Sequence, residues 1–175
     1  MKSKNYRTLT GIVFSSLFLF AFTGDGITGD IDYKRDALKG LEGVYVLIEP
    51  IRSEAQEDGL TEVLLQTDVE LQLRKAGIKV LTKEECFKTP GAPYLYINVN
   101  TVKFKNLELY SFNIKIELTQ YIQLERNPSI TIPADTWSVG MVGSVVASQM
   151  KSFVRESLGN LVDKFINDYL VVNPI

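Results

Sequence analysis

The sequence has no histidine and only one cysteine, Cys86, and these two shortages exclude several kinds of functional site. Without histidine the chain cannot build a Ser-His-Asp or Cys-His catalytic set, or a zinc site of cysteine and histidine. One cysteine cannot form an internal disulfide bond. The acidic neighbours Glu84 and Glu85 disfavour a thiolate, so we interpret Cys86 as a structural residue and not as a reactive thiol.

The sequence also has no excess of positive charge, and its composition is that of an ordinary folded domain. The 175 residues include 19 Lys and Arg against 21 Asp and Glu, a net charge of -2, so we expect no nucleic-acid partner. Hydrophobic residues make up 45% and charged residues 23%, which excludes a wholly disordered chain. The length suits a single domain with short tails.

Long hydrophobic runs are missing except near the start of the chain, at Ile12–Phe22. Three basic residues and no acidic residue precede this run, a layout that predicts a secretory signal peptide over residues 1–23. The run is too short to span a membrane, and no cysteine follows it that could carry a lipid anchor. We therefore expect export to the bacterial periplasm, with no lipid anchor and no stable membrane span after signal removal.

Residues 24–37 are polar and rich in glycine and aspartate, and are predicted to be a flexible lead-in to a single domain over residues 38–175. The segment Gly24–Gly29 matches the pattern G-x-G-x-x-G, but a dinucleotide site needs a strand before that pattern and a helix after it. Counted from Asp25, the acidic residues do not match the ligand positions of an EF-hand. We therefore expect neither a cofactor nor a metal ion.

Hydrophobic periodicity predicts the α+β class with an α/β-like start: one mixed sheet of about five strands, with a crossover helix and a long C-terminal helix packed on it. Thr82 and Glu85 have capping-box spacing, which predicts the start of a short helix. The predicted strands cover 44–48, 78–81, 94–102, 112–124 and 130–142. The predicted helices cover 61–76, one or two turns from Thr82, and 144–170, and a loop is predicted over 53–59.

Several elements carry more detailed expectations. The continuous apolar strand 44–48 is expected to be buried, and the helix 61–76, which is apolar on two opposite sides, is expected to be covered on both. Residues 112–124 alternate between apolar and polar side chains, which predicts a half-solvated antiparallel strand. Only Gln120 interrupts the apolar row and only Tyr121 the polar row. Pro133 favours an edge strand or a bulge in the strand that returns.

Tyr94, Tyr96, Asn98 and Asn100 form an aromatic and polar row on one face of the strand 94–102. Tyrosine combines apolar area with a polar tip, so this row is suited to binding a carbohydrate, a peptide or another subunit. The alternative is that the C-terminal helix covers this face and the tyrosines belong to the core. Trp137, near two glycines, is interpreted as a packing residue, with an exposed apolar patch as the alternative.

Several stretches resemble, in element order and local pattern, a domain of bacterial envelope proteins. They are GVYVLIEP, GLTEVLLQTDVELQLRKAGIKVLTKEE, YLYINVNTV and NIKIELTQYIQLERN. The domain that they resemble is the α/β domain shared by the curli secretion protein CsgG, the penicillin-binding-protein activator LpoB and the amino-terminal domain of TolB. No catalytic or binding motif accompanies this resemblance, which implies envelope work through protein contacts and without enzymatic activity.

These observations predict an exported, periplasmic, non-enzymatic binding or adaptor protein of the bacterial cell envelope. Its partner is expected to be an envelope protein or a second copy of the chain. One alternative is an envelope hydrolase that uses two carboxylates, with Glu84 or Asp135 acting together with Glu117. The other alternative is a structural homo-oligomer joined through strand edges or the C-terminal helix.

Overall fold

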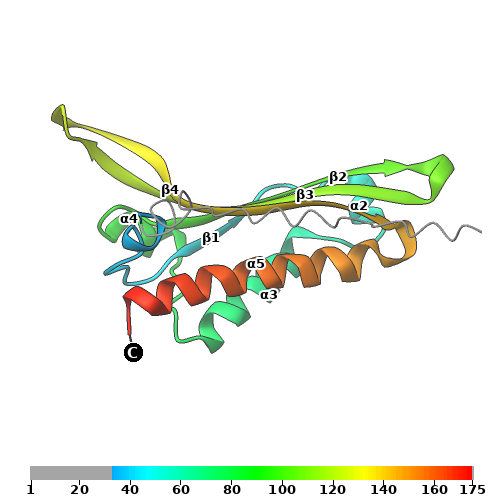
Figure 1. The fold of residues 1–175 in the computed structure, drawn as a ribbon, viewed down its shortest axis with the longest axis horizontal. Coiled ribbons are helices and arrows are strands. Elements are labelled where there is room, and N and C mark those ends of the chain that lie inside the picture. Colours follow the sequence, from blue (N-terminus) through cyan, green and yellow to red (C-terminus); the bar gives the residue numbers. More distant parts are fainter. Residues whose placement is uncertain (1–32, 175) are drawn as a thin grey trace, which may run out of the picture.

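The computed structural model describes residues 33–174, which form one mixed four-stranded sheet with helices packed against it (Figure 1). The predicted α+β class is thereby confirmed. The predicted signal peptide (1–23), the Gly24–Gly29 pattern and most of the predicted lead-in lie outside the described residues. The strands are β1 (Tyr45–Ile48), β2 (Tyr94–Phe104), β3 (Leu109–Leu124) and β4 (Asn127–Val146). They lie in the order β1-β2-β3-β4, with β1 parallel to β2 and the other pairs antiparallel.

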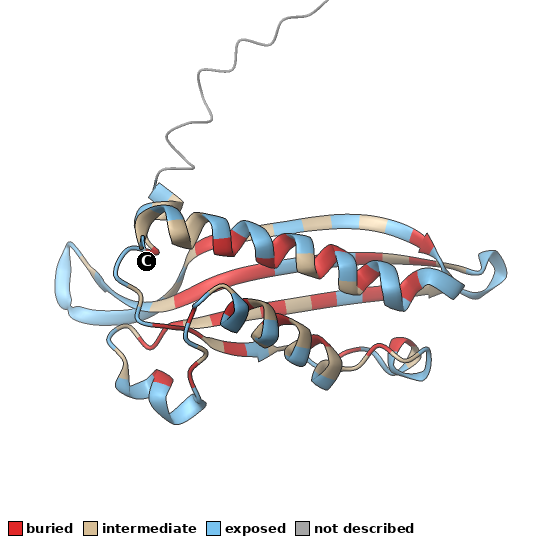
Figure 2. Cartoon of the chain, turned by 90° about the horizontal axis from the view of Figure 1, so that it is seen from below, coloured by how far each residue is buried: buried red, intermediate tan, exposed pale blue. Residues whose placement is uncertain are grey.

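Three helices connect β1 to β2, and a long helix ends the described chain. They are α2 (Ser53–Glu57), α3 (Glu62–Lys75), α4 (Lys83–Lys88) and α5 (Met150–Val172). α3 and α5 lie side by side on one face of the sheet (Figures 1 and 2). Arg155 of α5 binds Asp68 of α3 through two hydrogen bonds of 2.7 and 2.9 Å. No helix within residues 33–174 has the length and apolar character needed to cross a membrane.

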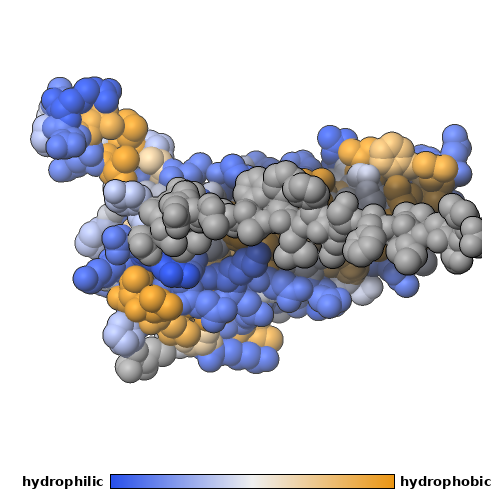
Figure 3. All heavy atoms as spheres, in the orientation of Figure 1, coloured by the Kyte–Doolittle hydropathy of each residue, from blue (hydrophilic) through white to orange (hydrophobic). Residues whose placement is uncertain are grey.

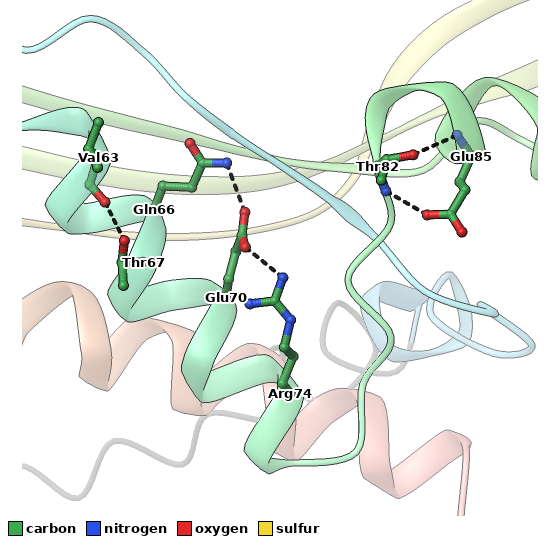
Figure 4. Close-up of polar contacts among 7 residues, drawn as sticks. All are labelled: Val63, Gln66, Thr67, Glu70, Arg74, Thr82 and Glu85. Atoms are coloured by element: carbon green, nitrogen blue, oxygen red, sulfur yellow. Dashed lines mark hydrogen bonds and ion pairs between the residues drawn. The ribbon is translucent and has the colours of Figure 1, made fainter.

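Short-range signals explain where α3 and α4 begin. Thr61 caps α3, since its hydroxyl accepts a hydrogen bond from Leu64 N at 3.3 Å. The capping box predicted at α4 is present: Glu85 N donates to Thr82 Oγ1 at 3.2 Å, and Thr82 N donates to Glu85 Oε2 at 2.8 Å (Figure 4). Figure 4 also shows the hydrogen bonds that link successive turns of α3.

The sheet has four strands where about five were predicted, because residues 78–81 do not form a strand. Val80 reaches the sheet only through an isolated parallel bridge to Val44. The backbone N–H of Val44 donates to the carbonyl of Lys79 at 3.0 Å. The pairing of this segment with β1 ends here because α4 follows almost at once, with Thr82 as its N-cap. The crossover predicted from 44–48 through the helix 61–76 to 78–81 is present only as this parallel bridge, and the parallel partner of β1 along its length is β2.

Two segments have a different secondary structure from the one predicted. The predicted loop 53–59 contains α2, a helix of 5 residues that is too short to show a helical hydrophobic period. The predicted helix 144–170 starts later, at Met150, because residues 144–146 continue β4 and pair with residues 109–111 of β3. The valines of this stretch fit the period of a helix or a strand equally well, and pairing with β3 decides between them.

The two long helices cover only one face of the sheet, and on the other face α4 packs only beside Tyr45 and Tyr94; this corrects two predictions about burial. α3 is not covered on both sides: Leu65 and Leu73 are buried against the sheet, whereas Val63 is 74% exposed. The apolar run of β1 is also buried on one side only, since Val46 is buried and Leu47 is 37% exposed. Both predictions assumed a second covering layer, which the described part of the chain does not supply.

The hydrophobic core lies between the sheet and the two long helices (Figure 2). Its most buried members include Leu95, Ile97, Ile114, Ile116, Leu118, Val154 and Val162. Trp137 of β4 is 3% exposed and packs edge-on against Phe165, with ring centroids 5.2 Å apart. The indole Nε1 of Trp137 donates to Asp168 at 3.0 Å. The interpretation of Trp137 as a packing residue is therefore confirmed.

The β3–β4 hairpin extends beyond the core and projects away from the helix side (Figure 1). The predicted alternation holds for the apolar side chains from Phe112 to Leu118, all of which are buried, but Glu117 of the polar row is buried as well. Beyond Gln120 both sides of the hairpin are largely exposed, and a register shift marks the change near Thr136. Pro133 lies in this exposed part of an edge strand, as predicted. Figure 3 shows apolar surface on the hairpin, to which the exposed residues Ile122, Ile130 and Ile132 belong.

Alanine substitutions at Gly143 and Gly159 should have opposite effects on the free energy of unfolding. The reason is that Gly143 of β4 lies against the ring of Phe112, whereas Gly159 of α5 is not crowded. A Cβ atom at Gly143 would lie 2.6 Å from Phe112 Cζ, and this buried ring packs on Phe153 with little room to move. We expect Gly143→Ala to lower the free energy of unfolding by about 1–3 kcal/mol. Gly159→Ala in α5, where a Cβ meets only ordinary contacts, should raise it by about 0.5–1 kcal/mol.

Urea unfolding of the two glycine variants measures both effects in one series. Because both substitutions add the same methyl group, the comparison separates crowding against Phe112 from any general effect of replacing glycine. A Gly143→Ala variant as stable as the parent chain would contradict the close packing of β4 on β3.

Candidate functional site

The predicted row of Tyr94, Tyr96, Asn98 and Asn100 lies on the face of the sheet opposite α3 and α5. The residues that alternate with this row along β2 are buried beneath the helices. The asparagine at the far end of the row is exposed, and the other three members are partly exposed. The alternative in which the C-terminal helix covers the row is therefore wrong. We call this surface the open face.

The middle of the open face is polar, and its charges are paired. The side-chain amide of Asn100 donates to Asn98, whose own amide donates to Glu49. Lys115 lies opposite Asn98 in the next strand and forms an ion pair with Glu117, with 2.5 Å between Nζ and Oε1. This hydrogen bond to the Glu117 carboxylate raises the pKa of Lys115. The two asparagines are thus held in fixed orientations by their neighbours.

The tyrosine end of the row meets a cavity of about 280 Å³. Tyr45 of β1 lies directly opposite Tyr94 of β2 in the parallel ladder, and Tyr121 of β3 supplies a third phenol to the cavity. The full lining is Tyr45, Leu47, Lys83, Cys86, Phe87, Ala92, Tyr94 and Tyr121. The site therefore combines aromatic walls with a single charged group, the ammonium of Lys83.

The predicted row is divided between two surroundings, and sequence analysis missed part of the site. Tyr94 lines the cavity, whereas Asn98 and Asn100 belong to the polar network. Tyr96 lies along β2 between Tyr94 and Asn98. Tyr45 and Tyr121 were not predicted as site residues. Tyr121 carried a usable signal, since it alone interrupts the polar row of residues 112–124. Tyr45 sits within an apolar run, and nothing in that run distinguishes it from a core residue.

Cys86 is one of the residues that line the cavity, and it makes the contacts of a structural residue. Its side chain is buried, and Sγ donates to the carbonyl of Pro93 at 3.4 Å. Burial raises the pKa of the Cys86 thiol, so the thiol stays protonated at neutral pH. These contacts agree with the structural role predicted for Cys86.

None of the carboxylates considered for hydrolysis lines the cavity. Glu117 is paired with Lys115, and Asp135 accepts a hydrogen bond from the hydroxyl of Thr119 at 2.7 Å. Glu84 is exposed on α4, and none of the three carboxylates belongs to the cavity lining. Within residues 33–174, no group of three or more Cys, Asp or Glu side chains is arranged to hold a metal ion.

In comparisons with known proteins, no family model and no curated protein sequence matches this chain. Function is therefore inferred from the open face, from its cavity and from the sequence features described above.

Proposed function

We propose that this protein is an exported, periplasmic, non-enzymatic adaptor of the bacterial cell envelope, and that its open face binds a partner protein. The observation that carries this proposal is the cavity with tyrosines from three neighbouring strands, on a face that neither long helix covers. The signal-peptide pattern of residues 1–23 supports export. The resemblance to the envelope α/β domain supports protein contact as the mode of action.

The chemistry of the open face suits one anchoring side chain surrounded by polar contacts. The cavity volume of about 280 Å³ is near the lower limit of small-molecule pockets, a size that accepts one or two apolar side chains. Tyrosines lose little conformational freedom when a partner covers them, and they dominate the energetics of many protein interfaces. The neighbouring amides of Asn98 and Asn100 provide hydrogen bonds at the rim. This division matches the apolar centre and polar edge of a typical interface.

A photoreactive amino acid in place of Tyr96 tests the open face in the native cell envelope. We expect irradiation of cells that carry the tagged full-length chain to give a covalent adduct with one envelope protein. The same amino acid in place of Val63 is the matched control, because Val63 is 74% exposed but lies on α3, on the helix side. The adduct at position 96 should also decrease at least about tenfold when Tyr94→Ala and Tyr121→Ala are introduced together.

Equal adducts at positions 96 and 63, or no adduct at either position, would contradict binding through the open face. Fractionation of the same cells tests export separately. We expect the chain in the periplasmic extract with residues 1–23 removed. Recovery from the cytosol with those residues attached would contradict the export part of the proposal.

A further inference from the structure

β4 forms one edge of the sheet, and half of it lacks the charged residues and prolines that often protect an exposed edge, although a register shift near Thr136 marks its beginning. Among the described residues only β3 pairs with β4. Natural edge strands usually carry charged residues, proline or a bulge, because their unpaired N–H and C=O groups would otherwise accept another strand. From Thr136 to Val146, β4 has neither a charged residue nor a proline.

The opposite edge of the sheet and the other half of β4 are both protected in the usual ways, so residues 136–146 differ from the remaining edges. β1, at the opposite edge, has only 4 residues and is followed at once by Glu49 and Pro50. Within β4 itself, Pro128, Pro133 and Asp135 all lie in the half that forms the projecting hairpin. The unprotected half is therefore the part of β4 that runs along the core.

The side chains along this half of β4 are apolar or small. Val142 is 77% exposed, more than any other large hydrophobic residue of the four strands. Gly140, two positions earlier on the same face, carries no side chain. Because the stretch itself is uncharged, placing it opposite an identical stretch brings no like charges of the two β4 strands together. The edge is thus complementary to itself.

We propose that two copies of this chain pair through β4, antiparallel, about a two-fold axis at Met141. The two four-stranded sheets then become one continuous eight-stranded sheet, since the axis is perpendicular to the sheet and keeps both helix layers on one side. Val142 of each copy lies opposite Gly140 of the other, and Val139 lies opposite Gly143. Large residues thus face small ones, and the axis at Met141 pairs the whole of residues 136–146.

This dimer uses a different surface from the adaptor proposal. The cavity is formed by β1, β2, β3 and α4, and the paired edge is on the far side of the sheet. Both open faces stay accessible in the dimer. Loss of one property therefore leaves the other measurable.

Val142→Lys tests the dimer, with Val63→Lys as its matched control. Both substitutions replace an exposed valine, 77% and 74% exposed, and both add one positive charge. Lysine is a common protecting residue of natural edge strands, and a dimer of the Val142→Lys variant would place one such lysine from each copy at the paired edge. In sedimentation equilibrium of the mature chain, we expect a monomer–dimer equilibrium whose dissociation constant rises about 100-fold in Val142→Lys and is unchanged in Val63→Lys. A parent chain that stays monomeric across the micromolar range would overturn the proposal.

Disulfide cross-linking tests the register. Directly opposite residues of antiparallel strands have Cβ atoms close enough for a disulfide, so Met141→Cys should cross-link to its own copy under mild oxidation. The parent chain is the background control, because its one cysteine is buried. Val171→Cys, on an exposed position of α5, represents association through the C-terminal helix. Faster cross-linking at position 171 than at 141, or a dimer that survives Val142→Lys, would overturn pairing through β4.

Discussion

Replacing Phe165 with alanine should lower the free energy of unfolding by about 3–5 kcal/mol. The Phe165 side chain is completely buried, and its ring packs against Trp137 at 5.2 Å and Tyr169 at 6.3 Å between centroids. Both neighbours are held in place, Trp137 by its bond to Asp168 and Tyr169 by a 2.9 Å bond to the carbonyl of Leu41. They cannot move to fill the space, so alanine leaves a cavity between α5 and β4. Urea unfolding followed by tryptophan fluorescence measures the loss.

Phe153→Ala is the matched control for Phe165→Ala. Phe153 lies on the same helix but is 40% exposed, and its ring packs against Phe112. Because water already reaches this ring, we expect a loss of only about 1–2 kcal/mol. Equal losses in the two variants would show that the helix side of β4 is not the tightly packed part of the core.

Tyr110→Phe should lower the free energy of unfolding by about 1.5–3 kcal/mol at neutral pH, the range for a hydrogen bond to a charged group. The buried phenol of Tyr110 donates to Asp58 Oδ2 at 2.6 Å. Asp58 also binds Lys103 Nζ at 2.6 Å. These contacts connect the end of α2 to β2 and β3. Phenylalanine keeps the packing of the ring and removes only the hydroxyl, so the loss reports the bond to Asp58 together with a longer contact of 3.1 Å to the carbonyl of Glu54.

The effect of Tyr110→Phe should also depend on pH. Hydrogen bonds from Lys103 and then from Tyr110 lower the pKa of Asp58 from its ordinary 3.8. A carboxyl group whose pKa is lowered by folding contributes stability that is complete above its unfolded pKa and is lost as the pH falls through the folded pKa. The difference between the parent and Tyr110→Phe should therefore be complete at neutral pH and should shrink in acid below pH 3.8.

Tyr169→Phe provides the control for this pH dependence. Its hydroxyl donates to an uncharged backbone carbonyl, that of Leu41. We expect a loss of about 0.5–1.5 kcal/mol that does not change between neutral and acid pH. Stability measured by urea unfolding across this pH range compares the two variants. If the loss in Tyr110→Phe were equally independent of pH, Asp58 would not be its acceptor.

The parts of the fold that could be predicted are those whose signals lie within one element. Alternation from Phe112 to Leu118 indicates a strand because a sheet covered on one side buries every second residue. The Thr82 and Glu85 pair marks a helix start because both hydrogen bonds are made within four residues. Such signals do not depend on where the rest of the chain goes.

The parts that were predicted wrongly depend on distant neighbours. Val63 and Val69 lie on different sides of one amphipathic helix, and only the position of the sheet decides which side is buried. Val145 and Val146 fit either a helical stripe or a strand, and pairing with Leu109 and Tyr110 decides for the strand. A single helix or strand carries no record of these contacts.

The candidate site shows the same division. The four residues of the row could be found because they alternate along one strand. The cavity could not, because Tyr45, Tyr94 and Tyr121 come from three strands and meet only through the parallel register of β1 and the length of β3. That register follows from the crossover, whose geometry no local pattern in the sequence specifies.

The connections between neighbouring strands differ greatly in length, so the entropy cost of closing them differs from one strand pair to the next. Residues 125–126 join β3 to β4 and residues 105–108 join β2 to β3, whereas residues 49–93 separate β1 from β2. The entropy cost of closing a loop rises with the logarithm of its length, so bringing β1 to β2 costs about 2 kcal/mol more than closing the β2–β3 connection. β1 has the shortest ladder to offset that cost. Its place in the sheet, and with it the wall of the cavity, therefore depends on the burial of α3 more than on strand pairing.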